Sequence, residues 1–252
     1  MKAAPREFDV IVLGATGFTG ALVAEYLIDR YGVGDGLRWA AAGRNEQKLA
    51  TLRETLGSRA RSLPLIVADT LDAASMRQLA ERARVVLTTV GPYARYGSEV
   101  VAACAESGTH YCDLAGEVQW IRRMIDAHND TARRSGARIV HCCGFDSIPM
   151  DIGAWFLQNE ANQRYGAYCD SIVLLVKAMK GGASGGTMAS MMNLMREARA
   201  DREVASVLAR PYSLNPAGEQ RGPDRGDQRG VRFDAETQSW TAPFIMAAFN
   251  TR

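Results

Sequence analysis

Three glycines at three-residue spacing lie near the start of the chain, in the segment GATGFTG at residues 14–20. An apolar, β-type run precedes them, and a helical pattern follows. Between a strand and a helix, Gly14 permits a tight turn, Gly17 lets the backbone approach a phosphate, and Gly20 lets the helix pack closely on the strand. Free N–H groups and the helix dipole favour negative charge there, so the segment predicts a pyrophosphate site. A glycine-rich turn without a ligand is the alternative.

A second position distinguishes the two nicotinamide cofactors. Dinucleotide folds bind the adenosine ribose at the end of the second strand, where an acid accepts from the 2′-hydroxyl and repels a 2′-phosphate. Here the segment Gly43-Arg44-Asn45 contains no acid, and Lys48 follows one turn later. A guanidinium pairs with phosphate and stacks on adenine, so Arg44 favours NADP(H) over NAD(H). A solvated surface arginine is the alternative.

Two later strand ends supply further candidates. Asp69 ends the third predicted strand, where it could meet the adenine amino group or start the next helix. The fourth strand ends in Gly91-Pro92-Tyr93, and ligands of open α/β sheets lie beyond the carboxyl ends of the strands. This loop is therefore expected beside the nicotinamide, bringing Tyr93 and Tyr96 near the reacting ring. Packing aromatics are the alternative for both tyrosines.

The candidates for polarising a carbonyl or delivering a proton are Tyr93, Tyr96 and, next, Asp146. Asp146 follows the last strand of the series and faces the same crevice, although a cap for the helix near Pro149 is the alternative reading. His141 lies inside an apolar strand and is interpreted as a hydrogen-bonded core histidine. None of the tyrosines is followed by a lysine four residues later, so the catalytic pair of short-chain dehydrogenases is missing.

Strand and helix patterns alternate along the first 150 residues, and these elements must position the candidate residues. The alternation predicts a parallel sheet with helices on both faces. The fold class is α/β, with a Rossmann-type, doubly wound dinucleotide-binding domain at residues 1–149. The predicted strands cover 8–13, 37–42, 63–68, 84–90, 110–113 and 137–142. The predicted helices cover 17–31, 45–57, 72–83 with Asp72 as N-cap, 97–107 and 117–135.

Beyond Pro149 the pattern changes, and residues 150–252 predict a second, incomplete α/β domain. A helix at 150–163 precedes the longest apolar strand of the chain, Ser171–Met179. A glycine-rich turn leads to a methionine-rich helix, for which Thr187 is the predicted N-cap. The methionine face of this helix is interpreted as part of a core. The alternative is that it lines a pocket for a long acyl chain. Residues 213–230 have the composition of a flexible loop, and 231–249 resemble strand material.

The amino-acid composition limits which partners, metal sites and cellular locations are expected. The formal net charge is +2 with acids and bases interspersed, so no nucleic-acid partner is predicted. The five cysteines have no metal-ligand spacing, and their odd number fits a reduced, cytoplasmic compartment. No metal site is predicted. No apolar run is long enough for a transmembrane helix, while peripheral contact with the plasma membrane and homo-oligomerisation stay open.

Taken together, five motifs in order resemble the saccharopine dehydrogenase-like oxidoreductases, and most closely the branch of mycobacterial trans-acting enoyl reductases, which serve polyketide-derived lipid assembly. The motifs are GATGFTG at 14–20, AGRN at 42–45, GPY at 91–93, YCDLAGE at 111–117 and GFDSIP at 144–149. The resemblance implies that Gly14, Thr16, Gly17, Phe18 and Thr19 hold the pyrophosphate and that Arg44 takes the 2′-phosphate. It also implies that Gly91, Pro92 and Tyr93 lie beside the nicotinamide, that 113–117 forms the next loop at the sheet edge, and that 144–149 forms a hinge.

The leading hypothesis is an NADPH-dependent oxidoreductase that reduces an enoyl group (a CH–CH donor reaction) in a lipid or polyketide pathway. Its substrate would be a small molecule or a carrier-bound acyl intermediate, and its implied partner is a polyketide synthase. A saccharopine-type amino-acid or imine dehydrogenase is one alternative. A non-catalytic NADP-binding sensor or scaffold is the other. Family members run longer than this chain, which leaves the completeness of the substrate pocket open.

Overall fold

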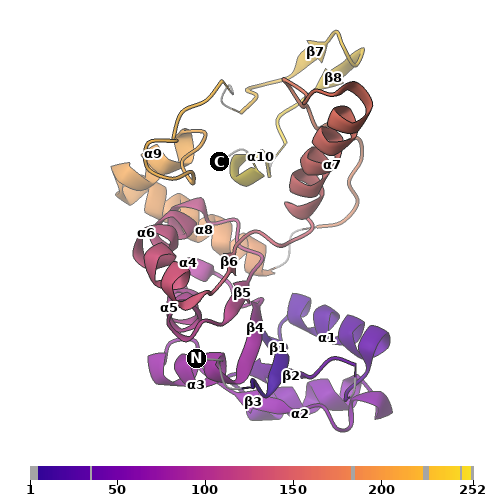
Figure 1. Cartoon of the computed structure of the whole chain (residues 1–252), viewed down its shortest axis with the longest axis vertical. Helices are drawn as coiled ribbons and strands as arrows, with labels where there is room; N and C mark the ends of the chain where they lie inside the picture. The colour runs from indigo at the N-terminus through magenta and orange to yellow at the C-terminus, as the bar shows by residue number, and fades with distance from the viewer. Residues whose placement is uncertain (1–4, 35, 183–184, 224–226, 245, 251–252) are drawn as a thin grey trace.

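The computed structural model describes residues 5–34, 36–182, 185–223, 227–244 and 246–250. Its lower part in Figure 1 is a six-stranded sheet in which every neighbouring pair of strands is parallel. The strands are β1 (Phe8–Leu13), β2 (Trp39–Gly43), β3 (Leu65–Val67), β4 (Ala83–Thr88), β5 (His110–Cys112) and β6 (Ile139–Val140). All six predicted strands are confirmed, several of them shorter than expected.

The spatial order of the strands is β3-β2-β1-β4-β5-β6. The chain runs outward from β1 to one edge and then crosses back to β4, so the order reverses between β1 and β4. This is the switch point at which dinucleotides bind in doubly wound sheets. The predicted Rossmann-type topology is therefore confirmed.

Helices cover both faces of the sheet and bury two separate cores. The helices are α1 (Phe18–Tyr31), α2 (Glu46–Thr55), the short 3-10 turn η1 (Ser58–Ala60), α3 (Ala73–Arg82), α4 (Tyr93–Tyr96), α5 (Ser98–Ser107) and α6 (Val118–Ser135). One core joins α1 and α2 to the sheet through Val12, Leu27 and Leu49, and the other joins α3, α5 and α6 through Ile11, Leu79 and Trp120. The predicted N-cap is confirmed, because Asp72 Oδ1 accepts from the amide of Ala74 at 2.8 Å.

The second part of the chain contains little sheet. Its elements are α7 (Ile148–Tyr165), α8 (Gly185–Ala200), α9 (Arg202–Ala209), the antiparallel hairpin of β7 (Arg232–Asp234) and β8 (Ser239–Thr241), and α10 (Ala247–Asn250). The hairpin confirms part of the predicted strand material at 231–249, of which residue 245 lies outside the described residues. Residues 213–223 and 227–230 form no helix or strand, as predicted for the loop, and 224–226 lie outside the described residues.

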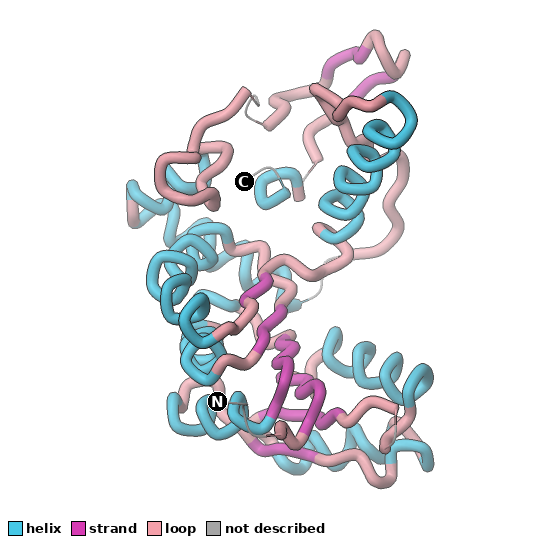
Figure 2. The backbone as a smooth tube through the Cα atoms, in the orientation of Figure 1, coloured by secondary structure: helices cyan, strands magenta, loops and turns pink. Residues whose placement is uncertain are grey.

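Three predictions for this part are wrong. The strand predicted at Ser171–Met179 is an irregular, exposed segment between α7 and α8 (Figure 2), because a strand forms only beside another strand. Thr187 lies inside the first turn of α8 and is not its N-cap.

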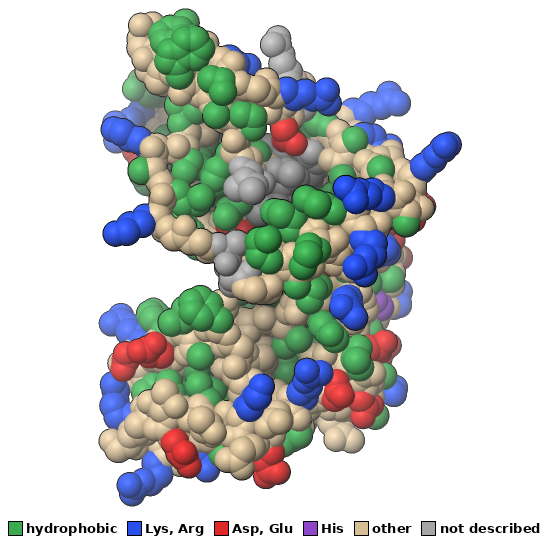
Figure 3. Space-filling view, turned by 180° about the vertical axis from the view of Figure 1, so that it is seen from behind, with side chains coloured by type: hydrophobic (Ala, Val, Ile, Leu, Met, Phe, Trp, Pro, Cys, Tyr) green, Lys and Arg blue, Asp and Glu red, His purple; other side chains and the backbone are tan. Residues whose placement is uncertain are grey.

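The third error concerns the methionine face of α8. Met188, Met192 and Met195 are 48%, 61% and 52% exposed, so they do not form a core. Seen from behind, hydrophobic side chains lie open on the upper part of the molecule (Figure 3). The described helices include none that is long and apolar enough to cross a membrane.

Candidate cofactor site at the carboxyl edge of the sheet

The glycine-rich turn joins β1 to α1 and has the geometry of an anion site. Gly14 adopts a φ of +87°, which side chains disfavour, and a Cβ at Gly20 would lie 2.1 Å from the carbonyl oxygen of Gly14. Gly17 caps α1 without a side-chain hydrogen bond, and the first turn contains no acid. Among the described residues, nothing accepts from the backbone amides of residues 18–20. These donors at a helix N-terminus fit a diphosphate.

The end of β2 adjoins this turn. A Cβ at Gly43 would lie 3.6 Å from Thr16 Oγ1, so the residues after Gly43 begin beside the predicted pyrophosphate position. Arg44 and Lys48 are exposed, and neither side chain makes an ion pair or hydrogen bond within the described part of the chain. Their charges are thus available to a phosphate. Asn45 has another role, because its Oδ1 accepts from the amide of Lys48 at 2.9 Å and caps α2.

Asp69 follows β3 and organises its own loop. Its Oδ1 accepts from the amide of Leu71 at 3.0 Å, and its own amide donates to Ser75 Oγ at 3.1 Å. The side chain is exposed, and the structure thus shows the local, structural role that the sequence left open. The predicted contact with adenine stays a prediction.

The side chain of Tyr93 is buried, and its hydroxyl is hydrogen-bonded to the protein. It is 6% exposed, and its hydroxyl donates to the carbonyl of Thr88 and accepts from the amide of Leu114, both at 3.2 Å. Burial, together with the charge of Asp113, raises the pKa of Tyr93 far above its ordinary value. Its ring is stacked on that of Trp120 with centroids 5.6 Å apart. The structure thus shows the packing role that the sequence left open for Tyr93, and its catalytic role stays a prediction.

Tyr96 and Asp146 keep free functional groups. Neither the Tyr96 hydroxyl nor the Asp146 carboxylate has a hydrogen-bond partner among the described residues, and both side chains are half-buried. The guanidinium of Arg95 lies 5.7 Å from the ring centroid of Tyr96. The carboxylate of Asp146 occupies the space beside Gly144, since Oδ1 lies 2.5 Å from where a Cβ would stand. Asp146 is not the cap of α7, because that position belongs to Ser147.

A buried carboxylate that sequence reasoning had placed only within a loop organises the Gly91–Tyr93 segment. Glu117 is 1% exposed, and its Oε1 accepts from the amide of Tyr93 at 2.7 Å and from Ser190 Oγ at 2.9 Å. Its Oε2 accepts from the amide of Ala94 at 3.1 Å. Glu117 thus links the loop after β4 to the start of α6 and to α8. An acid before a helix was visible in the sequence, but its partners on other elements were not.

The ends of β5 and β6 are joined by a second buried carboxylate. Asp113 Oδ2 accepts from the hydroxyl of Tyr111 at 2.8 Å and lies 2.6 Å from Nδ1 of His141. Its Oδ1 accepts from the amides of Ala115 and Cys142 at 2.9 and 3.0 Å. His141 is accordingly the hydrogen-bonded core histidine that the sequence predicted. The pair fixes the loop at 113–117 against the segment that follows β6.

The described residues give little support to a reactive thiol or to a metal site. Burial raises the pKa of both Cys112 and Cys142 to about 12, so these thiols are protonated at neutral pH. The Cys142 Sγ donates to the carbonyl of Ala115 at 3.0 Å, which is a packing role. Within the described ranges, no three His, Cys, Asp or Glu side chains are grouped to hold a metal ion.

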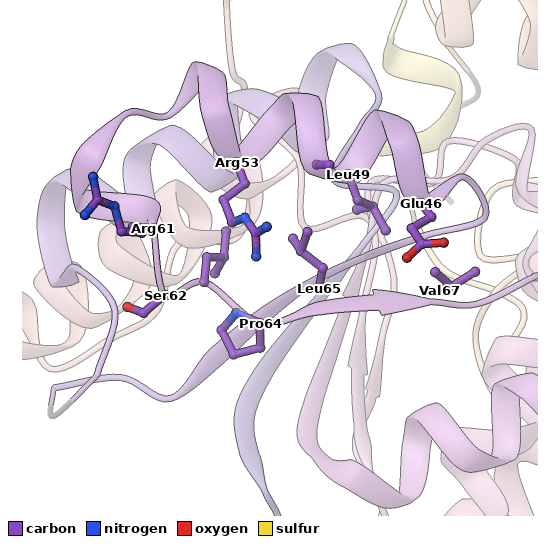
Figure 4. Close-up of a pocket in the computed structure, with 10 residues that line it drawn as sticks. Glu46, Leu49, Arg53, Arg61, Ser62, Pro64, Leu65 and Val67 are labelled. Atoms are coloured by element: carbon purple, nitrogen blue, oxygen red, sulfur yellow. The ribbon is translucent and has the colours of Figure 1, made fainter.

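A cavity of about 440 Å³ lies elsewhere, on the outer flank of the sheet between α2 and β3 (Figure 4). Its lining includes Leu49 and Arg53 from α2 and Arg61, Pro64 and Leu65 from the segment leading into β3. None of the predicted cofactor residues lines it. The predicted cofactor residues lie instead at the carboxyl edge of the sheet.

Comparisons with known proteins identify the family of the sheet region. Residues 10–140 match the family described as the saccharopine dehydrogenase NADP binding domain. The whole chain is 44% identical over 258 residues to a Mycobacterium tuberculosis protein provisionally named a trans-acting enoyl reductase, and 40% identical over 260 residues to the trans-acting enoyl reductase of Mycobacterium ulcerans. The chain spans 61% of the length of each of these relatives.

Among solved structures, the apo histidine-tagged saccharopine dehydrogenase (L-Glu forming) from Saccharomyces cerevisiae is similar with a TM-score of 0.44 and 18% identity. That similarity covers 62% of this chain and 32% of the other chain.

Proposed function

The chain belongs to the saccharopine dehydrogenase NADP-binding family, and on that premise we propose that it acts in an NADPH-dependent enoyl reductase. The observation that carries this proposal is the identity of 40–44% over the whole chain to relatives named as trans-acting enoyl reductases. The cofactor is NADP(H), and the domain that binds it spans the glycine-rich turn and Arg44. The reaction would be the reduction of a carbon–carbon double bond beside a thioester carbonyl.

Bound NADPH would supply the hydride, and the residues of this chain would orient it. The amides of Phe18, Thr19 and Gly20 would hold the pyrophosphate, and Thr16 lines the same turn. Arg44, with Lys48 one turn away, would pair with the 2′-phosphate. The Gly91–Pro92 segment would lie beside the nicotinamide, where the hydrogen bonds of Glu117 hold its conformation. Such prior orientation is a large part of the rate enhancement expected of this site.

The proton that completes the reduction has two candidate donors, Tyr96 and Asp146. Each retains a free functional group near a strand end, which supports either one acting on the substrate. Tyr96→Phe and Asp146→Asn separate them, since each removes one titratable group with little change in shape. The donor's variant should lose about 100-fold or more in kcat with NADPH affinity unchanged, and the other should stay near the parent.

The substrate and partner follow from the names of the relatives. We propose a carrier-bound acyl intermediate, delivered by a polyketide synthase that lacks the reduction step. A cytoplasmic location fits such a partner. Contact with the plasma membrane surface would follow from the apolar product.

The cofactor assignment is tested by titrating the protein with NADPH and NADH while following nicotinamide fluorescence. Arg44→Ala should weaken the binding of NADPH about 10- to 100-fold by removing a charge-assisted phosphate contact, and it should leave the affinity for NADH unchanged. Arg53→Ala is the matched control, because this arginine of α2 lines the outer cavity and not the predicted site. Equal loss of both cofactors in Arg44→Ala would defeat the 2′-phosphate argument.

The reaction is tested by NADPH oxidation with enoyl thioesters presented on coenzyme A and on an acyl carrier protein. Turnover of the enoyl substrates and silence with saccharopine is the expected result. Activity with saccharopine alone would point to amino-acid dehydrogenation. Tight NADPH binding with no turnover of either substrate would point to a sensor or scaffold.

A further inference from the structure

The loop at residues 91–94, which follows β4, contacts α8 as well as the sheet region. Ser190 of α8 donates from its Oγ to Glu117 Oε1 at 2.9 Å. The same carboxylate oxygen accepts from the amide of Tyr93 at 2.7 Å. A Cβ at Gly91 would lie 3.7 Å from Ser190 Oγ, so the serine also borders the loop directly. The loop is thus in contact with both a buried carboxylate and a helix that comes about 100 residues later in the chain.

The carboxylate of Glu117 links the position of this loop to the position of α8. Its Oε1 is shared between the amide of Tyr93 and the hydroxyl of Ser190, and its Oε2 accepts from the amide of Ala94 at 3.1 Å. Within the described residues, Glu117 forms no ion pair. A buried charge of this kind is stabilised mainly by its hydrogen bonds. Displacing either the loop or α8 would therefore leave a charged oxygen without one of its donors.

A second contact ties α8 to the sheet region beside the first. Glu197 Oε2 accepts from Nη2 of Arg123 in α6 at 2.9 Å. Ser190 and Glu197 are seven residues apart in α8, which is about two helical turns, so both lie on the same face of the helix. That face is turned toward α6, and it places Ser190 at the loop.

We propose that Ser190 and Glu117 are positioning residues for the nicotinamide end of the cofactor, and that they couple cofactor binding to the docking of α8. The inference rests on the proposed function, which puts the nicotinamide beside Gly91 and Pro92. The nicotinamide would bind well only when the loop has the conformation that the shared carboxylate oxygen fixes. By thermodynamic linkage, a cofactor that stabilises this conformation also stabilises the docked position of α8.

The first test compares two ligands by isothermal titration calorimetry of the full chain. NADPH is one, and 2′-phosphoadenosine 5′-diphosphoribose, which keeps both phosphate groups and lacks the nicotinamide, is the other. Glu117→Gln puts an amide donor where a backbone N–H needs an acceptor. It should weaken NADPH binding about tenfold and leave the affinity for the fragment within about twofold of the parent.

Two further variants sharpen this comparison. Ser190→Ala removes one donor from Glu117 and should weaken NADPH binding about threefold, again with little effect on the fragment. Glu99→Gln is the matched control, because it makes the same chemical change on an exposed side chain in the first turn of α5. It should alter neither affinity. Urea midpoints of all variants check that each one folds.

The second test measures amide hydrogen exchange in α8. NADPH should slow the exchange of residues 185–200 about threefold more than the fragment does, because only NADPH reaches the loop at residues 91–94. Ser190→Ala should remove this difference. Residues 18–31 of α1, beside the predicted pyrophosphate position, should be protected equally by both ligands in the parent and in the variant.

The outcomes separate this inference from the proposed function. An unchanged ratio of NADPH affinity to fragment affinity in Glu117→Gln would overturn the coupling, and so would equal protection of α8 by the two ligands. A purely structural role of Glu117 would weaken both ligands alike, which also contradicts the proposal. A parent chain that shows the coupling and reduces no enoyl thioester would instead overturn the proposed reaction and leave the coupling in place.

Discussion

Residues 8–147 and residues 148–250 differ in what holds them together. The first region contains the six-stranded sheet and both hydrophobic cores. In the second, the described part of the chain buries only Val204 and Ser213, and α7 and α8 bury no side chain. Because burial of apolar surface is the main stabilising term, the first region is expected to carry the stability. The second leaves most of its described apolar side chains exposed.

The largest difference in stability between the two regions should appear when one tryptophan in each is replaced by alanine. Trp120 is 1% exposed, and Trp120→Ala should lower the free energy of unfolding by about 3–5 kcal/mol through lost burial and the cavity left behind. Trp155 of α7 is 65% exposed, and Trp155→Ala should change it by about 0.5 kcal/mol or less in a monomeric sample. Urea denaturation followed by circular dichroism measures both. Equal losses would mean that the second region has a core of its own.

Replacing a glycine by alanine should also have opposite effects on stability in the two regions. Gly20→Ala should cost about 1–3 kcal/mol and abolish NADPH binding, because the new Cβ would collide with the backbone of Gly14. Gly153 in α7 has no atom within 4 Å of its Cβ position, so Gly153→Ala should stabilise that helix by about 0.5–1 kcal/mol. Chemical denaturation and nicotinamide fluorescence read out the two effects. A tolerated Gly20→Ala would contradict the close packing of α1.

Two capping aspartates offer a smaller contrast. Asp72 caps α3 inside the sheet region, and Asp72→Ala should cost about 1 kcal/mol of global stability. Asp201 caps α9 by accepting from the amide of Glu203 at 2.8 Å. Asp201→Ala should fray α9 and shift global stability by about 0.5 kcal/mol or less, because α9 lies outside the main core. Hydrogen exchange of each helix separates local fraying from global unfolding.

The smallest effect concerns pH. The hydrogen bonds and charge of Arg38 lower the pKa of Asp9 to about 2, from an ordinary value near 4. A depressed pKa in the folded state stabilises the protein above the unfolded pKa, and this contribution is lost as the pH falls from about 4 to about 2. Arg38→Ala should therefore reduce the free energy of unfolding at pH 7 by only a few tenths of a kcal/mol, about 0.3, and weaken its decrease between about pH 4 and pH 2. Urea midpoints at pH 7 and pH 3 test it.

The part of the fold that sequence analysis predicted well is the part stabilised by its own residues. The glycine turn, the apolar strand runs and Asp72 are local signals, and all three are confirmed. The predicted strand at Ser171–Met179 failed for the opposite reason. A strand depends on its neighbours, and the pattern of side chains cannot reveal whether a neighbour exists.

The residues of the candidate site also differ in whether the sequence alone could predict their contacts. The helix start after Gly17 and the exposed position of Arg44, which has no ion pair in the described part of the chain, were expected from the motif and its position. The burial of Tyr93 and the hydrogen bonds of Glu117 were not, because each depends on residues more than twenty positions away. Asn45 could have been identified as a helix cap, since an asparagine directly before a helix commonly has that role.

The sequence by itself determined the order of strands and helices in the sheet region, the glycine-rich turn and the assignment of NADP(H), because hydrophobic periodicity, glycine conformation and motif spacing are local properties. Only the tertiary structure decided which of Tyr93 and Tyr96 is hydrogen-bonded within the described residues, which carboxylates are buried and which apolar side chains stay exposed. Those outcomes depend on contacts between segments distant in the chain, and their free energies are set by burial and hydrogen-bond geometry that exist only after folding.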